Sequence, residues 1–107
     1  MAVLGEFEQL ILMAVLRAGD AAYGIPIHAE LVRHTGRDPS LGSVYKTLER
    51  LEHKGFLAMR TGAPTPERGG RRKQLYRVTN AGQKELRAAL GAIRRMASGL
   101  DVGLEPS

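Results

Sequence analysis

The residues with the clearest chemistry in this sequence are cations and hydrogen-bond donors. Four cations fall within six residues, at Arg68, Arg71, Arg72 and Lys73, around the pair Gly69-Gly70. Guanidinium and ammonium groups bind phosphate oxygens, and glycine lets a backbone approach a bulky polyanion closely. Such a run also suits a plain solvated loop, so its meaning depends on the elements around it.

A second group of donors lies on a predicted helix over residues 40–54, on a face without carboxylates. Its members are Ser43, Lys46, Thr47, Arg50 and Lys54. Ammonium and guanidinium donors reach phosphates or the acceptor atoms of guanine in the major groove, and hydroxyls make shorter contacts. Ser40 caps this helix, whose free amides favour a phosphate oxygen. Tyr45 and Tyr23 fit packing as well as they fit nucleic-acid contact.

The same inventory gives no support for catalysis. The three histidines, His28, His34 and His53, are not spaced to place two metal ligands on one helix face. No glycine-rich phosphate loop follows a predicted strand, and neither Ser40 nor Ser43 has a visible histidine and aspartate partner. We therefore expect no enzyme activity, no metal and no cofactor.

The charge is concentrated in the middle of the chain. The 107 residues carry a net charge of +5, and residues 37–79 alone hold ten basic against four acidic side chains. Zero cysteines suit a reducing compartment, and neither a leader nor an apolar stretch of about 18 residues is visible. We expect a cytoplasmic protein with a polyanionic partner and no membrane contact.

The elements that must position these residues are three helices, a hairpin and a fourth helix. Apolar periodicity predicts helices over 7–16, over 24–35 and over 40–54, the last with Leu41, Val44, Leu48 and Leu51 inward. Strands are expected at 56–60 and 73–79, joined by a long basic loop. The fold class is therefore mainly α with a small β-hairpin: a winged helix-turn-helix over 1–79 and a C-terminal dimerisation helix and tail over 80–107.

The last helix carries an apolar stripe that the small domain leaves without a partner. Its members are Leu86, Leu90, Ile93, Ala97 and Leu100. We expect this stripe to pair with a second copy, giving a homodimer. With the helix 40–54 in the major groove and the wing 61–73 on the backbone or in the minor groove, the chain would bind double-stranded DNA. A winged helix that docks a protein or RNA is the alternative, although RNA readers more often display aromatics on a sheet.

Three segments resemble the PadR family of bacterial transcriptional regulators. They are Tyr23-Gly-Ile, Ser40-Leu-Gly-Ser-Val-Tyr-Lys-Thr-Leu-Glu-Arg-Leu-Glu-His-Lys-Gly55 and Glu67-Arg-Gly-Gly-Arg-Arg-Lys-Gln-Leu-Tyr-Arg-Val-Thr79. The resemblance implies a homodimeric repressor on a pseudo-palindromic operator, often released by a small effector. It also implies DNA contacts by Tyr23, Ser40, Ser43, Tyr45 and the basic wing. The chain resembles the short members with one C-terminal helix, but it lacks the tryptophans that hold flat ligands in some of them.

Overall fold

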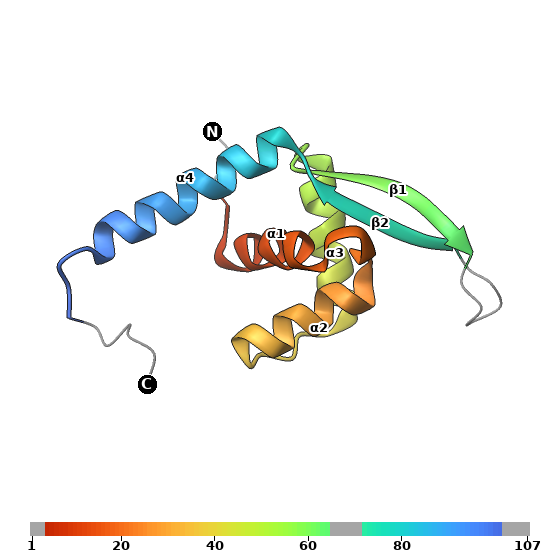
Figure 1. The fold of residues 1–107 in the computed structure, drawn as a ribbon, viewed down its shortest axis with the longest axis horizontal. Helices are drawn as coiled ribbons and strands as arrows, with labels where there is room; N and C mark the ends of the chain where they lie inside the picture. The colour runs from red at the N-terminus through yellow and green to blue at the C-terminus, as the bar shows by residue number, and fades with distance from the viewer. Residues whose placement is uncertain (1–3, 65–71, 102–107) are drawn as a thin grey trace.

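The computed structural model describes residues 4–64 and 72–101, and they follow the predicted order of elements. Figure 1 shows three helices, α1 (Glu6–Ala18), α2 (Gly24–Thr35) and α3 (Leu41–His53), followed by the strands β1 (Leu57–Pro64) and β2 (Arg72–Val78) and the helix α4 (Asn80–Ala97). One 3-10 turn, η1 (Gly19–Ala21), joins α1 to α2. The predicted fold class, mainly α with one antiparallel hairpin, is confirmed.

Local side chains set the helix boundaries. The Ser40 hydroxyl accepts a hydrogen bond from the Ser43 amide at 3.1 Å, and the Thr79 hydroxyl accepts one from the Gly82 amide at 3.0 Å. Each hydroxyl satisfies an amide that the first turn leaves free. Gly36 ends α2 with a φ of 72°, in the left-handed conformation that side chains with a Cβ disfavour.

The core forms where α1, α2 and α3 meet, and it extends to the inner face of the hairpin. Its largest fully buried side chains are Ile11, Leu12, Ile27, Val44, Leu48 and Leu51. The expected inner stripe of α3 is therefore confirmed at three of its four positions.

Leu41 departs from that expectation, because it is 42% exposed. It lies in the first turn of α3 and about 60° around the helix from Val44. At that end of α3 the neighbouring helices do not cover it, so it faces solvent.

The hairpin is longer than the sequence indicated. Leu57 pairs with Val78 and Met59 with Tyr76, and an irregular register between Thr61 and Pro64 extends β1 beyond the predicted end at residue 60. The Tyr76 amide donates a hydrogen bond to the Ala22 carbonyl at 2.8 Å, which ties the outer edge of β2 to the segment before α2. The hairpin is thus fixed to the helical core along its base.

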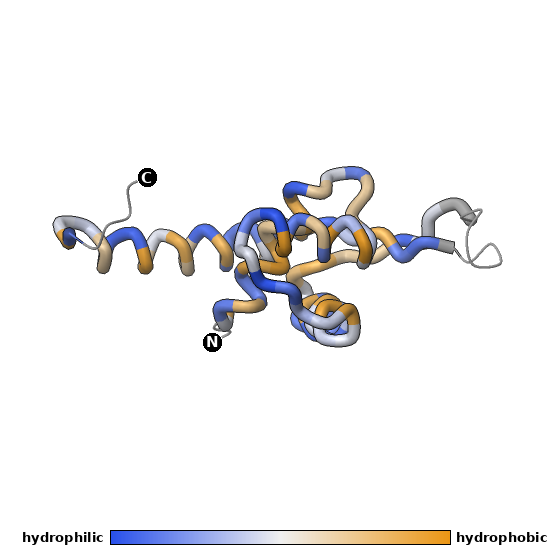
Figure 2. The backbone as a smooth tube through the Cα atoms, turned by 90° about the horizontal axis from the view of Figure 1, so that it is seen from below, coloured by the Kyte–Doolittle hydropathy of each residue, from blue (hydrophilic) through white to orange (hydrophobic). Residues whose placement is uncertain are grey.

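Helix α4 leaves the core and projects away from the hairpin (Figures 1 and 2). Leu86 is only 5% exposed and belongs to the core of its own protomer, so its assignment to the dimer stripe is corrected. The first turn of α4 packs closely against the segment that follows α3. A Cβ added at Gly82 would lie only 2.3 Å from the Phe56 carbonyl oxygen. In addition, the Thr79 amide donates to that carbonyl at 3.1 Å and the Thr79 hydroxyl donates to the Gly55 carbonyl at 2.7 Å.

Candidate nucleic-acid interface

The exposed face of α3 is narrower and more mixed in charge than the sequence suggested. Val44, Thr47, Leu48 and Leu51 are buried. The outermost line, opposite them at 100° per residue, runs through Gly42, Lys46, Glu49 and His53, all exposed. The sequence analysis expected a face without carboxylates, yet Glu49 lies one turn after Lys46 on this line. Donors therefore concentrate in the first half of the face, and the second half carries a carboxylate.

Thr47 is the clearest correction to the predicted donor face. The residue is 3% exposed, and its hydroxyl donates to the Ser43 carbonyl at 2.9 Å. Thr47 lies between Val44 and Leu48 in the chain, at the margin of the core. There its short side chain forms a hydrogen bond with the backbone of its own helix. Thr47 is therefore unavailable to an external partner.

The start of α3 keeps its predicted place at the surface. Ser40 is exposed and Ser43 is half-buried, and besides the cap bond the Ser43 hydroxyl donates to the Ser40 carbonyl at 2.9 Å. The hydrogen bonds of these two serines thus stay within the first turn of α3. The N-terminal end of the helix remains exposed to solvent, where its free amides and its dipole favour an anion.

The structure brings two predicted tyrosines and a predicted lysine to neighbouring positions. Lys73 Nζ lies 4.6 Å from the centroid of the Tyr23 ring, a cation–π contact between β2 and the start of α2. Gly24 follows Tyr23 in the chain, and the Tyr45 ring packs closely against it. A Cβ at Gly24 would lie 2.3 Å from the Tyr45 hydroxyl oxygen. Tyr45 is still 41% exposed. One surface therefore runs from α3 over the start of α2 to the wing.

The centre of the predicted wing lies outside the described residues. Arg68, Gly69, Gly70 and Arg71 fall there, and so does the side chain of Arg72, although its backbone opens β2. Lys73 is the one predicted wing cation whose side chain the structure describes.

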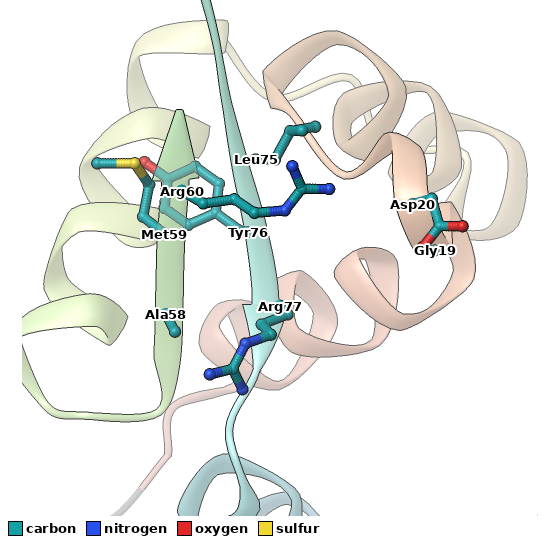
Figure 3. Close-up of a pocket in the computed structure, with 8 residues that line it drawn as sticks. All are labelled: Gly19, Asp20, Ala58, Met59, Arg60, Leu75, Tyr76 and Arg77. Atoms are coloured by element: carbon teal, nitrogen blue, oxygen red, sulfur yellow. The ribbon is translucent and has the colours of Figure 1, made fainter. Parts of the chain in front are cut away.

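Two further cations lie on the outer face of the hairpin and escaped the sequence reasoning. Arg60 and Arg77 border a surface hollow of about 270 Å³ between the hairpin and Asp20 of η1 (Figure 3). The signal was available, because the two-residue alternation of the strands places both arginines opposite the buried Tyr76 and Val78. They enlarge the basic surface of the hairpin.

Arg50, predicted as a DNA contact, is instead engaged by Glu8 of α1. Its Nε lies 3.2 Å from Glu8 Oε2, and Lys54 Nζ lies 2.7 Å from the same oxygen. The second carboxylate oxygen accepts the Gly5 amide at 2.9 Å. Burial raises the pKa of Glu8, but the hydrogen bonds from Lys54, Gly5 and Arg50 outweigh it and hold the pKa below its usual value.

An apolar patch covers the outer half of α4 and extends past its end, and we define it as Ala92, Ile93, Met96, Ala97 and Leu100. Ile93 is 56% exposed, Met96 is 79% exposed and Leu100 is 61% exposed. Of the predicted stripe, Leu90 is half-buried against the core, while Ile93, Ala97 and Leu100 belong to the patch. Met96 is the most exposed large apolar side chain of the described residues.

Other kinds of site find no support in the described ranges. No group of three or more histidine, cysteine, aspartate or glutamate residues there could hold a metal ion. No helix within residues 4–64 or 72–101 is long and apolar enough to cross a membrane.

These elements define a winged-helix fold. Three helices pack together, an antiparallel hairpin is fixed to their edge, and the third of these helices, α3, exposes polar side chains along its outer face. The chain belongs to the transcriptional regulator PadR-like family, whose sequence profile matches residues 11–88. A comparison with curated protein sequences found no match.

Solved structures show the same fold. A PadR family transcription regulator from hypervirulent Clostridium difficile R20291 is 24% identical with a TM-score of 0.64, over 84% of this chain and 90% of that one. Bacillus subtilis PadR, solved in complex with operator DNA, is 22% identical with a TM-score of 0.65, over 89% of this chain and 60% of that one. F93 from STIV, a winged-helix DNA-binding protein, is 15% identical with a TM-score of 0.71, over 94% of this chain and all of that one.

Proposed function

We propose that this protein is a sequence-specific DNA-binding transcriptional repressor that acts as a homodimer in the cytoplasm and has no enzyme activity. The observation that carries the proposal is the continuous surface from the open start of α3, across Tyr45 and Tyr23, to Lys73 of the wing. Family membership supports the same function. Residues 1–79 would form the DNA-binding unit and residues 80–107 the dimerisation arm and tail.

In the proposed complex, the first half of α3 enters the major groove. Lys46 reads base acceptors or binds a phosphate, and Ser40 and Ser43 make shorter contacts. Tyr23 and Tyr45 lie beside Lys73, where the start of α2 would meet the sugar-phosphate backbone of the DNA. Arg68, Gly69, Gly70, Arg71 and Arg72 keep their proposed role on the backbone or in the minor groove. Thr47 and Arg50 are left out of this set because of their contacts inside the protomer.

The apolar patch on α4 supports the proposed dimer. The residues of the patch are all apolar, and they lie on an arm that extends beyond the core (Figure 1). Burial of such a surface against a second copy removes it from water. A two-fold axis there would place the two α3 helices about 34 Å apart, one turn of duplex, and the operator would be pseudo-palindromic. As the family resemblance implies, the proposal includes a small-molecule effector that releases the repressor from its operator.

The test is equilibrium binding to a duplex from the DNA upstream of the protein's own gene, followed by footprinting. We expect a protected, approximately two-fold symmetric site and an affinity that falls steeply with salt, by about 0.9 log units per log unit for each phosphate neutralised. A random duplex and an RNA of equal length are the controls. Equal binding to all three, or preference for RNA, would replace this proposal with the interaction-module alternative.

A further inference from the structure

Glu8 is the one charged side chain among the described residues that is buried, at 6% exposed, and the proposed function leaves it without a role. It lies in the first turn of α1, yet it bonds two cations that follow it by 42 and 46 residues, both at the end of α3. A carboxylate buried with two hydrogen-bonded cations holds them much more firmly than an exposed pair does.

The contacts continue along α3 to its first turn. Arg50 Nη2 donates to the Thr47 hydroxyl at 3.4 Å, and this hydroxyl donates to the Ser43 carbonyl at 2.9 Å. The Ser43 amide in turn bonds the Ser40 cap. One flank of α3 is thus joined by hydrogen bonds from Glu8 to the turn that would meet DNA.

The cations held by Glu8 have the chemistry that phosphate contacts require. Arg50 keeps a side chain that is 53% exposed and Lys54 one that is 33% exposed, so neither is shut away from solvent. The Glu8 carboxylate occupies them as a phosphate oxygen would. One carboxylate balances one of the two positive charges, so the charge that this pair could lend to any duplex, whatever its sequence, falls from +2 to +1 inside the protomer.

We propose that Glu8 is a positioning residue for DNA recognition, which fixes the flank of α3 and withholds Arg50 and Lys54 from the phosphate backbone. It lowers nonspecific affinity and leaves binding to the first half of α3 and the wing. This inference rests on the proposed function, because it concerns how that surface discriminates among duplexes.

The experiment measures the salt dependence of binding to a random duplex for the full chain and its Glu8→Gln variant. Glu6→Gln is the matched control, because it makes the same change of charge two residues away. Glu6 is 72% exposed and its partner is Arg37, at 2.8 Å, rather than α3. We expect Glu8→Gln to bind the random duplex more tightly and to steepen the log–log salt slope by about 0.9, the value for the one positive charge that Glu8 balances. Glu6→Gln should stay close to the wild type.

A second variant keeps the test decisive if circular dichroism shows that Glu8→Gln does not fold. The double variant Arg50→Gln plus Lys54→Gln, in the presence of Glu8, should lower the salt slope by no more than about 0.9, the value for the one charge that Glu8 leaves unbalanced. A slope that falls by about 1.8 in this variant, or a Glu8→Gln slope equal to that of Glu6→Gln, would overturn the inference. A wild type that shows no salt-dependent binding to any duplex would instead refute the proposed function, and this inference with it.

Discussion

Gly82→Ala tests the junction between the winged helix and α4. An added Cβ would lie 2.3 Å from the Phe56 carbonyl oxygen and 2.9 Å from Val78 Cγ1, both shorter than any normal contact. The first neighbour is backbone, which cannot rotate aside as a side chain can. Either α4 or the chain at Phe56 must therefore move.

The expected magnitude combines three terms. Forcing a methyl group into packed surroundings costs about 1–3 kcal/mol. Displacing the Phe56 carbonyl weakens its hydrogen bond from the Thr79 amide, which is worth about 1 kcal/mol. Alanine in a helix gains about 1 kcal/mol over glycine. The net loss in the free energy of unfolding is about 1–3 kcal/mol, and each kcal/mol lowers the Tm by roughly 4–8 °C in a domain of this size.

The assay is urea unfolding followed by circular dichroism, at one protein concentration for all variants. Gly91→Ala, on the same helix, is the control: its added Cβ would meet only the flexible end of Arg95, at 3.3 Å. We expect that variant to be neutral or more stable by up to about 1 kcal/mol. If Gly82→Ala were as stable as Gly91→Ala, the close approach of α4 to Phe56 would be refuted.

Three further predictions use other parts of the molecule. The pKa of Glu8 is lower in the folded protein than in the unfolded chain, so its ion pairs stabilise the fold at pH values above the unfolded pKa and lose this contribution as the pH falls through the folded pKa. The difference in the free energy of unfolding between wild type and Glu8→Gln should therefore narrow below about pH 5. A constant difference in urea titrations would contradict the pairing. Leu41, exposed in the first turn of α3, should contact a thymine methyl group in the operator. Replacing that thymine by uracil in one half-site should then weaken binding about fourfold for the wild type but leave Leu41→Ala unaffected. Equal sensitivity in both proteins would remove Leu41 from the interface. Met96→Asp should give monomers in sedimentation while circular dichroism stays unchanged, whereas a persistent dimer would place the interface away from the apolar patch.

Features that depend on near neighbours in the chain could be predicted from the sequence. Ser40 caps its helix as expected, since a cap acts within three residues. The alternation that buries Tyr76 and Val78 is equally local. The fold class followed from the order of such elements.

Features that depend on where one element ends against another could not be predicted. Periodicity placed Leu41 and Leu86 on apolar stripes, but only the tertiary arrangement shows that the core stops short of Leu41 and reaches Leu86. Arg50 looked like a free donor because its partner Glu8 lies 42 residues earlier. A single carboxylate inside the apolar run of α1 was the one local sign that a buried partner existed.

The junction at Gly82 has a mechanical consequence for the proposed dimer. Because the start of α4 packs closely against Phe56 and the Thr79 amide is hydrogen-bonded to it, α4 and the hairpin should move together as one rigid body. A helix of 18 residues is about 27 Å long, so a 5° change in its direction moves the far end by about 2 Å. The crossing angle of two such arms would then set the distance between the half-sites. Substitutions along the outer half of α4 could retune operator spacing while every residue that faces a base stays the same.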